Sequence, residues 1–351
     1  MDGLTGLRAI AAFWVIAFHY SVGPFSPLHP RQAVPLFGLG YLGVDLFFML
    51  SGFVIWHVHA SDFARPSAHA FRRFLMLRIA RLYPVYLFTL LLFVALLVLA
   101  PHLGGPKLDP RNYGAGQFLV DLGMVQTWGL ASHLEWNYPS WSISAEWFCY
   151  FLFPLAALSL ARLGRWRSVL GVATLVVALA GIYLFVFGET MNVALGAAAL
   201  TRALIEFLCG CLLRRVADFV PVRRIDWTPL LLMLLGVTVA AVLLHSVWAG
   251  FLPILLFPVL ILAASTETNL IGRIASWRPL VVVGNASYSL YLMQAPVQKG
   301  MRFLGQYVSL RHPGETALAV LGYGAALALG TALVYRLVEL PSRRALRRRL
   351  A

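Results

Sequence analysis

The stretch RIARLYPVYLFTLLLFVALLVLA occupies residues 78–100 and joins a basic amino end to an almost unbroken apolar run. A run of about 20 apolar residues matches the thickness of the hydrocarbon layer of a bilayer. Within that layer every backbone polar group needs an internal partner, so a single span of this kind is helical. The stretch therefore predicts a transmembrane helix over Tyr83–Ala100, with Arg78 and Arg81 at one membrane surface.

Nine further apolar runs flank this one, and we expect an all-α polytopic membrane protein with about ten transmembrane helices. The expected spans are Leu4–Val22, Gly38–His57, Tyr83–Ala100, Trp141–Ala161, Ser168–Gly188, Ala199–Leu213, Thr228–His245, Gly250–Ala264, Pro279–Val297 and Ala317–Val338. The composition agrees, because 60% of the residues are hydrophobic and only 12% are charged. Since the spans take up most of the chain, we expect a single domain over residues 1–351.

Basic residues are distributed unequally between the segments that join the spans. When alternate segments are assigned to the same side, nineteen of the 28 Lys and Arg residues fall on one side and six on the other, while Arg8, Arg202 and Arg336 lie within spans. Because basic loops remain in the cytoplasm, both termini are expected there. This topology accounts for the net charge of +14, so we expect contacts with membrane lipids and no nucleic-acid partner.

Ionisable residues inside spans are costly and usually functional. The candidates for a functional role are Arg8, His19, Asp45, Glu146, Arg202 and Glu206. From the topology, the histidine of the first span and the carboxylates of the second and fourth spans are expected at similar depth in the outer half of the membrane. Arg8 is expected near the cytoplasmic surface, together with the Arg78 and Arg81 pair.

Each of these residues also has a purely structural interpretation. Arg8 could extend its guanidinium to the interface, His19 could be an interfacial residue, and Asp45 could pair with an arginine or a backbone amide. Arg202 and Glu206 are four residues apart on one helix and could pair with each other. The arginine pair before the third span could serve only to orient the chain.

Together the residues suggest a group-transfer site. A histidine beside a carboxylate is a workable general base, because the carboxylate orients the imidazole and stabilises its protonated form. Arginines near the cytoplasmic surface suit a phosphate-rich ligand such as coenzyme A, because guanidinium binds phosphate in a bidentate manner. A proton-coupled permease would also need buried His, Asp and Glu residues, so this pattern by itself leaves both classes open.

Seven ordered motifs cover nearly the whole chain. They are GLRAIAAFWVIAFHY (6–20), GYLGVDLFFMLSGFVI (40–55), RIARLYPVY (78–86), WSISAEWFCYFLFP (141–154), RALIEFLCGCLL (202–213), GNASYSLYLMQAPV (284–297) and VELP (338–341). In this order they resemble the bacterial acyltransferase-3 family, integral membrane O-acyltransferases that modify carbohydrates or antibiotics. The resemblance places the family's motif residues on Arg8, His19, Asp45, Arg78, Arg81, Glu146, Ser287, Tyr288 and Ser289.

The chain departs from this family at two points. Where the ninth-span motif of the family often reads YLxH, Gln294 holds the last place, so we expect no proton chemistry there. Some members carry a fused extracytoplasmic hydrolase-like domain, and this chain shows none. We therefore expect direct transfer of the acyl group, or its transfer to a separate protein.

The resulting expectation is an O-acyltransferase of the bacterial inner membrane. It would move an acyl group, most simply acetyl, from cytoplasmic acetyl-CoA to a hydroxyl of a carbohydrate or lipid-linked glycan. His19 would be the base, Asp45 its orienting partner and Glu146 a supporting acid. The donor would be held by Arg8, Arg78 and Arg81, substrate contacts would come from Ser287, Ser289, Tyr291 and Trp141, and no metal is expected. A transporter or flippase for a glycan or small anion is the alternative, and a scaffold in a polysaccharide-assembly complex ranks last.

Overall fold

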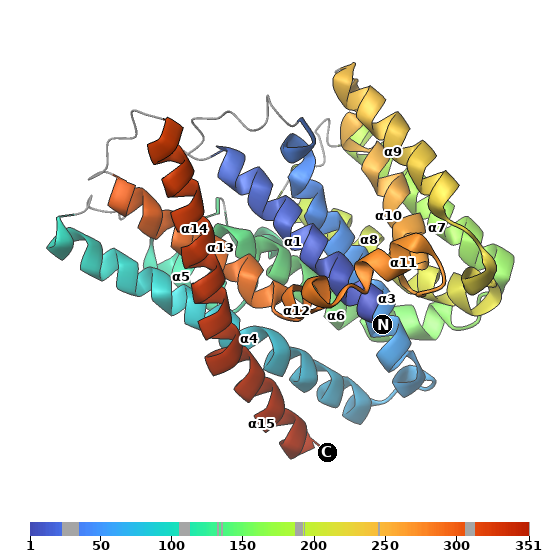
Figure 1. The fold of residues 1–351 in the computed structure, drawn as a ribbon. Coiled ribbons are helices and arrows are strands. Elements are labelled where there is room, and N and C mark those ends of the chain that lie inside the picture. Colours follow the sequence, from blue (N-terminus) through green and yellow to red (C-terminus); the bar gives the residue numbers. More distant parts are fainter. Residues whose placement is uncertain are drawn as a thin grey trace.

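The computed structural model describes residues 1–22, 35–104, 113–131, 133–134, 136–186, 192, 194–244, 246–305 and 313–350, and every regular element in these ranges is helical (Figure 1). The longer α-helices are α1 (Asp2–Val22), α3 (Gly43–His59), α4 (Ala68–Leu99), α6 (Trp141–Leu160), α7 (Arg165–Gly181), α8 (Gly196–Phe219), α9 (Thr228–Leu243), α10 (Leu252–Ala264), α13 (Ser287–Gly305) and α14 (Pro313–Val334). The shorter ones are α5 (Ala115–Leu122), α11 (Leu270–Ala275), α12 (Arg278–Asn285) and α15 (Leu340–Leu350). Short 3-10 or π turns that matter below are η1 (Pro35–Leu42), η6 (Tyr138–Ser140), η8 (Val222–Arg224) and η10 (Tyr335–Glu339).

Seven helical segments in the described ranges are long and apolar enough to cross a membrane. They are Asp2–Ser21, Leu36–Phe63, Ala68–His102, Tyr138–Leu160, Arg165–Val186, Gly196–Phe219 and Ala317–Ala345. They correspond to the first six expected spans and the tenth, so the all-α polytopic class is confirmed. The seventh and eighth expected spans are shorter apolar helices, Thr228–Leu243 and Trp248–Ala264.

The ninth expected span, Pro279–Val297, is not one continuous helix. It is divided into α12 and α13, which meet at Ala286. Treating residues 279–297 as one span overestimated the length of the helix, because Gly284, Asn285 and Ser287 interrupt the apolar run at the break. The two chain ends lie toward the same side of the bundle (Figure 1), while the assignment of that side to the cytoplasm remains a prediction.

The centre of the bundle depends on close packing of α3 against α8. A Cβ atom on Gly52 would lie 1.9 Å from the carbonyl oxygen of Phe207, and one on Gly210 would lie 2.0 Å from that of Met49. Only glycine permits the two backbones to approach this closely, as is common between helices in membranes. This contact sets the position of α3, which forms one wall of the site described below.

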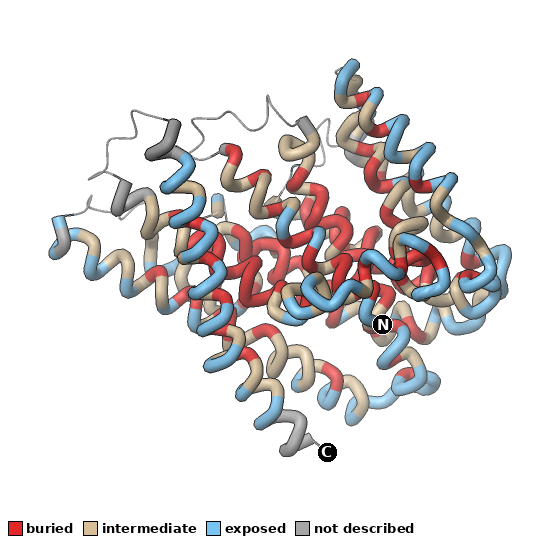
Figure 2. Tube along the Cα trace, viewed as in Figure 1, coloured by how far each residue is buried: buried red, intermediate tan, exposed pale blue. Residues whose placement is uncertain are grey.

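Burial is concentrated on the helices around this contact. Figure 2 shows buried residues in the middle of the bundle and exposed ones along the outer surfaces of α9 and α14. Many of the exposed side chains are large and apolar, such as Val177, Leu232 and Leu318, which is the pattern expected of helices that face lipid. The core is thus built mainly from α1, α3, α4, α6, α8, α10 and α13.

Candidate active site

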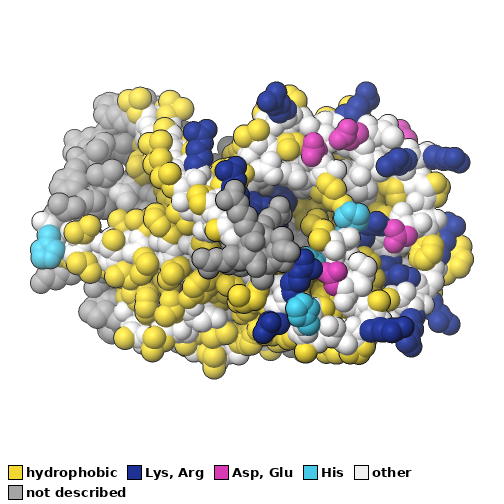
Figure 3. Space-filling model, turned by 90° about the horizontal axis from the view of Figure 1, so that it is seen from below, with side chains coloured by type: hydrophobic (Ala, Val, Ile, Leu, Met, Phe, Trp, Pro, Cys, Tyr) yellow, Lys and Arg dark blue, Asp and Glu magenta, His cyan; other side chains and the backbone are white. Residues whose placement is uncertain are grey.

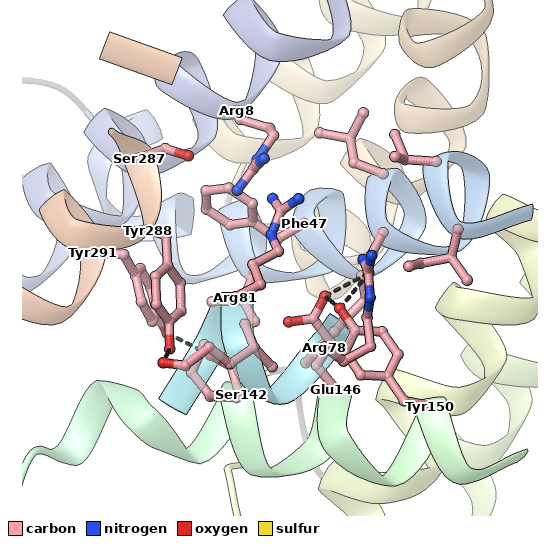
Figure 4. Close-up of a pocket in the computed structure, with 18 residues that line it drawn as sticks. Arg8, Phe47, Arg78, Arg81, Ser142, Glu146, Tyr150, Ser287, Tyr288 and Tyr291 are labelled. Carbon is pink, nitrogen blue, oxygen red and sulfur yellow. Dashed lines mark hydrogen bonds between the residues drawn. The ribbon is translucent and has the colours of Figure 1, made fainter. Parts of the chain in front are cut away.

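A cavity lies between α1, α3, α4, α6 and α13. Its lining contains four of the ionisable residues identified from the sequence, Arg8, Arg78, Arg81 and Glu146 (Figure 4). Its other polar lining residues are Ser51, Ser142, Tyr150, Ser287, Tyr288 and Tyr291. Three guanidinium groups and one carboxylate, contributed by three helices, therefore share one space inside the bundle.

The guanidinium groups of Arg8 and Arg81 lie close to each other in this cavity (Figure 4). Neither makes a hydrogen bond or an ion pair to any other described residue. Each guanidinium carries five N–H donors, and two like charges at close range repel each other unless an anion lies between them. This pair suits a ligand with several anionic oxygens, such as a phosphate group.

Arg78, by contrast, is held by protein groups on one side. Its Nη2 donates to Nε2 of His59 at 3.2 Å, and Nδ1 of His59 lies 2.9 Å from Oδ2 of Asp62. His59 accepts at one nitrogen and donates from the other, so this arrangement requires its neutral form. The guanidinium also lies 5.7 Å from the centre of the Phe74 ring, while its Nε is buried without a partner.

His59 and Asp62 were missed from the sequence. Their spacing of three residues places them on one face where α3 ends, and this is the only sequence signal that could have indicated a pair. In the structure they orient Arg78, because the histidine connects the exposed carboxylate of Asp62 to the guanidinium.

Glu146 is fixed by two hydroxyl groups. Its Oε1 accepts hydrogen bonds from Ser51 of α3 and from Tyr150, one turn further along α6, the latter at 2.6 Å. Sequence reasoning named neither donor, although a tyrosine four residues after a glutamate lies on the same helix face. These contacts hold the carboxylate at the cavity wall, beside Arg78 (Figure 4).

The expected depth of Glu146 was wrong. We expected it beside His19 in the outer half of the membrane, but it lines the cavity that contains the arginines. Counting from a membrane surface fails here because α6 begins inside the protein, where Ser140 and Trp141 are already buried. Residue 146 therefore reaches the arginine cavity, although it is only five residues from the start of the expected span.

His19 lies in a separate polar cluster and is not among the residues that line the cavity. Its Nδ1 is 3.2 Å from Oε1 of Gln294, and its backbone oxygen accepts from Nε2 of Gln298 at 3.2 Å. The imidazole packs edge-on against Tyr138 at 5.1 Å between ring centres, and the hydroxyl of Tyr138 donates to Gln298 at 3.1 Å. Gln294, where no proton chemistry was expected, thus contacts the predicted base.

Asp45 does not have the role that we expected. Its two carboxylate oxygens accept hydrogen bonds from Nε and Nη2 of Arg202 at 2.8 and 2.5 Å, and both residues are buried. The predicted pairing of Arg202 with Glu206 is replaced by this ion pair between α3 and α8. Because α3 packs against α8, Asp45 lies against Arg202. The carboxylate of Asp45 forms a buried ion pair with Arg202 and does not orient His19.

One face of α13 connects the cavity with the cluster around His19. Ser287, Tyr291, Gln294 and Gln298 follow one another at spacings of four, three and four residues, which places them on one face of a helix. Ser287 and Tyr291 line the cavity, while Gln294 and Gln298 contact His19. The hydroxyl of Ser287 is buried without a partner and is therefore available to a ligand.

Two predicted substrate contacts lie outside the cavity lining. Ser289 is two residues from Ser287, which turns it to the other side of α13, and its hydroxyl donates to Oε2 of Glu339 at 2.6 Å. Trp141 packs against Arg202, whose guanidinium carbon lies 5.4 Å from the centre of the indole ring. Both contacts join separate segments of the bundle. Tyr291, which does line the cavity, lies 2.9 Å from the hydroxyl of Ser142.

No described group of three or more His, Cys, Asp or Glu side chains could hold a metal ion. Cys149, Cys209 and Cys211 are buried free thiols. The chemistry that the described residues can offer is anion binding by arginines, proton transfer by an imidazole, and hydrogen bonding by hydroxyl and amide groups.

Comparisons with known proteins agree on one class. A family model described as an acyltransferase domain matches residues 1–336. The chain is 25% identical over 324 residues to O-acetyltransferase OatA of Staphylococcus aureus, covering 85% of this chain and 50% of that protein. It is 30% identical over 275 residues to acyltransferase MdmB of Streptomyces mycarofaciens, covering 76% of this chain and 62% of MdmB. It is 26% identical over 327 residues to the putative peptidoglycan O-acetyltransferase YrhL of Bacillus subtilis, covering 85% and 48%. The chain thus spans about half the length of OatA and YrhL, and no solved structure shows a significant match.

Proposed function

The chain belongs to the acyltransferase-3 family, and we propose that it transfers an acetyl group from cytoplasmic acetyl-CoA to a hydroxyl group of a glycan on the other side of the membrane. The observation that carries this proposal is the cavity in which Arg8 and Arg81 face each other with no anionic partner among the described residues. A donor that brings its own phosphates would neutralise both charges.

The donor assignment follows from charge and hydrogen bonding. The pyrophosphate of acetyl-CoA would accept from Arg8 and Arg81, with Arg78 held in reach by His59. The unpartnered hydroxyl of Ser287 would donate to the same group or to the pantetheine arm. Lined also by apolar side chains such as Phe47 and Phe48, the cavity excludes much of the water that would weaken these contacts.

The reaction requires a base near the acceptor. His19 would remove the proton from the acceptor hydroxyl, whose oxygen then forms a bond with the acetyl carbonyl carbon. The carbon–sulfur bond breaks, and the proton passes to the sulfur of coenzyme A. The face of α13 from Ser287 to Gln294 runs from the cavity to His19, so the acetyl end would extend along it.

We assign the acceptor to carbohydrate hydroxyls, either of a surface polymer such as peptidoglycan or of a lipid-linked glycan. The printed names of OatA and YrhL support O-acetyl transfer, and that of YrhL includes peptidoglycan. Bacterial relatives and the arginine-rich segments support a location in the bacterial inner membrane, with the arginine cavity reached from the cytoplasm.

The test uses the purified chain in lipid vesicles with acetyl-labelled acetyl-CoA. Labelled donor binding is measured first by equilibrium dialysis, and transfer of label to glycan fragments is measured separately. Replacing Arg8 and Arg81 by Gln should weaken donor binding by roughly 30-fold or more, because two charge-assisted contacts are lost at about 1–3 kcal/mol each. The matched control replaces Arg162 and Arg167, which are exposed and lie outside the cavity, and should leave binding unchanged.

Three outcomes would contradict the proposal. Donor affinity that survives loss of Arg8 and Arg81 would remove the cavity from donor binding. Transfer that persists in a folded His19→Gln variant would show that another group is the base. Accumulation of glycan across the membrane without ester formation would favour the transporter alternative.

A further inference from the structure

A second pocket contacts the carboxyl-terminal half of α3 and is separate from the donor cavity. Phe53 and His57, four residues apart on one face of α3, line it, whereas Ser51 and Ile55 line the donor cavity. The rest of the lining comes from the carboxyl end of α8, from η8 and from the end of α10. We call this space the η8 pocket. It shares no lining residue with the donor cavity, so the proposed donor site does not account for it.

The η8 pocket carries more positive charge than its surroundings neutralise. Arg214, Arg223 and Arg224 line it. Nη1 of Arg214 forms an ion pair with Asp218 at 2.5 Å, so the carboxylate of Asp218 neutralises the charge of Arg214. Arg223 and Arg224 are exposed, and their guanidinium groups form no ion pair with any described residue. Two full positive charges in the pocket therefore remain available to an anion.

His57 adds a directed donor. Nε of Arg214 donates to Nδ1 of His57 at 3.0 Å, so Nδ1 must carry the lone pair and Nε2 carries the proton. The pocket thus offers two arginines and one imidazole N–H. These are donors of the kind that bind phosphate oxygens in proteins.

Part of the remaining wall is apolar, and Ser265 and Thr266 form another part. Phe53, Ala217, Val220 and Val222 line the same pocket as the arginines, and the guanidinium of Arg214 lies 5.9 Å from the centre of the Phe53 ring. A small inorganic anion would leave these walls uncovered. An anion with an attached hydrocarbon chain would cover them and pair with the arginines at the same time.

The position of the pocket matches such a ligand. It lies where the spans containing α3 and α8 end, beside Met1. Figure 3 is seen from the side toward which both termini lie, and Lys and Arg side chains gather over one half of that face while hydrophobic side chains cover much of the other half. A lipid in the adjacent leaflet places its phosphate at this level and its acyl chains along the helices.

We propose that the η8 pocket binds an anionic phospholipid from the leaflet at this face, with the lipid phosphate held by Arg223, Arg224 and His57. An acyl chain lies against Phe53 and Val220. This site is independent of the donor and acceptor sites and needs no turnover.

Lipid binding by the purified chain tests the proposal directly. The delipidated protein in a neutral detergent is titrated with a fluorescent dioleoyl phosphatidylglycerol, and the same titration is made with the matching phosphatidylcholine. The wild-type chain should bind the anionic lipid at least tenfold more tightly. Replacing Arg223 and Arg224 by Gln should weaken that binding by roughly 10- to 30-fold, at about one order of magnitude or less for each arginine.

The matched control replaces Arg273 and Arg278 by Gln, which removes two exposed charges outside the pocket. This control should change lipid binding less than about twofold, because surface charge alone is weak at moderate salt. His57→Ala keeps all arginines and should weaken binding of the anionic lipid by a few fold. Elution as one sharp peak in gel filtration verifies folding of each variant.

Each contrary result overturns the proposal. Equal affinity of the unaltered chain for both lipids would show that there is no anionic lipid site, and this comparison needs no variant to fold. Equal losses in the η8 and control variants would assign the effect to diffuse charge. Displacement of the lipid by glycerol 3-phosphate or 3′,5′-adenosine diphosphate at the lipid's own concentration would make the pocket a site for soluble phosphates instead.

Discussion

Replacement of Arg202 by Met is expected to destabilise the chain strongly. Arg202 is 1% exposed and Asp45 is fully buried, and two hydrogen bonds of 2.8 and 2.5 Å join them. Glu206 is also fully buried, and neither of its carboxylate oxygens has a hydrogen-bond partner. Without Arg202, two buried carboxyl groups would lie in the bundle with no cation beside them.

The size of the effect follows from this geometry. Removing one partner of a buried ion pair costs about 3–5 kcal/mol, because the remaining charge keeps its desolvation cost and loses its attraction. At about 2 °C per kcal/mol for a chain of this size, the unfolding midpoint should fall by roughly 6–10 °C. The double variant Asp45→Leu with Arg202→Met removes both charges and should recover most of this loss.

Two measurements check the stability and the activity of these variants. Thermal unfolding is followed by tryptophan fluorescence in one detergent, and acetyl transfer is measured at a temperature where all variants are folded. A single variant as stable as the parent would refute the burial argument. A double variant that is stable but transfers no acetyl group would show that Asp45 or Arg202 is needed for the reaction. That result would contradict the assignment of Asp45 as a structural partner of Arg202 alone. A stable and active double variant would agree with a structural ion pair.

Three further predictions concern neighbouring contacts. Gly210→Ala places a Cβ atom 2.0 Å from a backbone oxygen of α3 and should lower the free energy of unfolding by about 1–3 kcal/mol. The loss is measured as a lower unfolding midpoint. An unchanged midpoint would mean that the two helices can move apart without loss of stability. Ser287→Ala should weaken acetyl-CoA binding by a few fold at unchanged stability. Ser289→Ala should lower stability by about 1–3 kcal/mol, because buried Oε2 of Glu339 loses its hydroxyl donor while Oε1 keeps its contact with Arg343. The reverse pattern in the two assays would contradict our assignment of the two faces of α13. His59→Ala should raise the KM for acetyl-CoA by roughly 3- to 10-fold with a smaller effect on kcat. Asp62→Asn should raise the same KM by a smaller factor. A change confined to kcat would place His59 in the chemical step.

Much of the architecture could be predicted from the chain. Apolar runs of sufficient length lead to helices wherever lipid is the solvent, because no other single span satisfies its backbone. Seven of the ten expected spans correspond to long apolar helices, and two more to shorter ones. The break at Ala286 has a local signal, because Gly284 and Asn285 precede it and Ser287 follows it. An average of hydropathy over the whole span does not register so short an interruption.

The arginine-lined cavity could be predicted in part. Arg8, Arg78 and Arg81 were expected together near one membrane surface, and the structure places all three on one cavity. Arginines at the ends of spans can be assigned a depth from helix rise and topology. Glu146 was placed at the wrong depth because the point where α6 begins depends on the buried turn η6 before it.

The sequence alone determined that this is a helical membrane protein with arginines, a histidine and carboxylates inside its spans, since hydrophobicity and charge act locally along a chain. The tertiary structure decided which of these residues meet. Asp45 lies against Arg202 because α3 and α8 approach through Gly52 and Gly210, and His19 lies against Gln294 because of how α13 is turned. Rotation and sliding of one helix against another leave no periodic trace in either helix, so only packing of the whole bundle could select these partners.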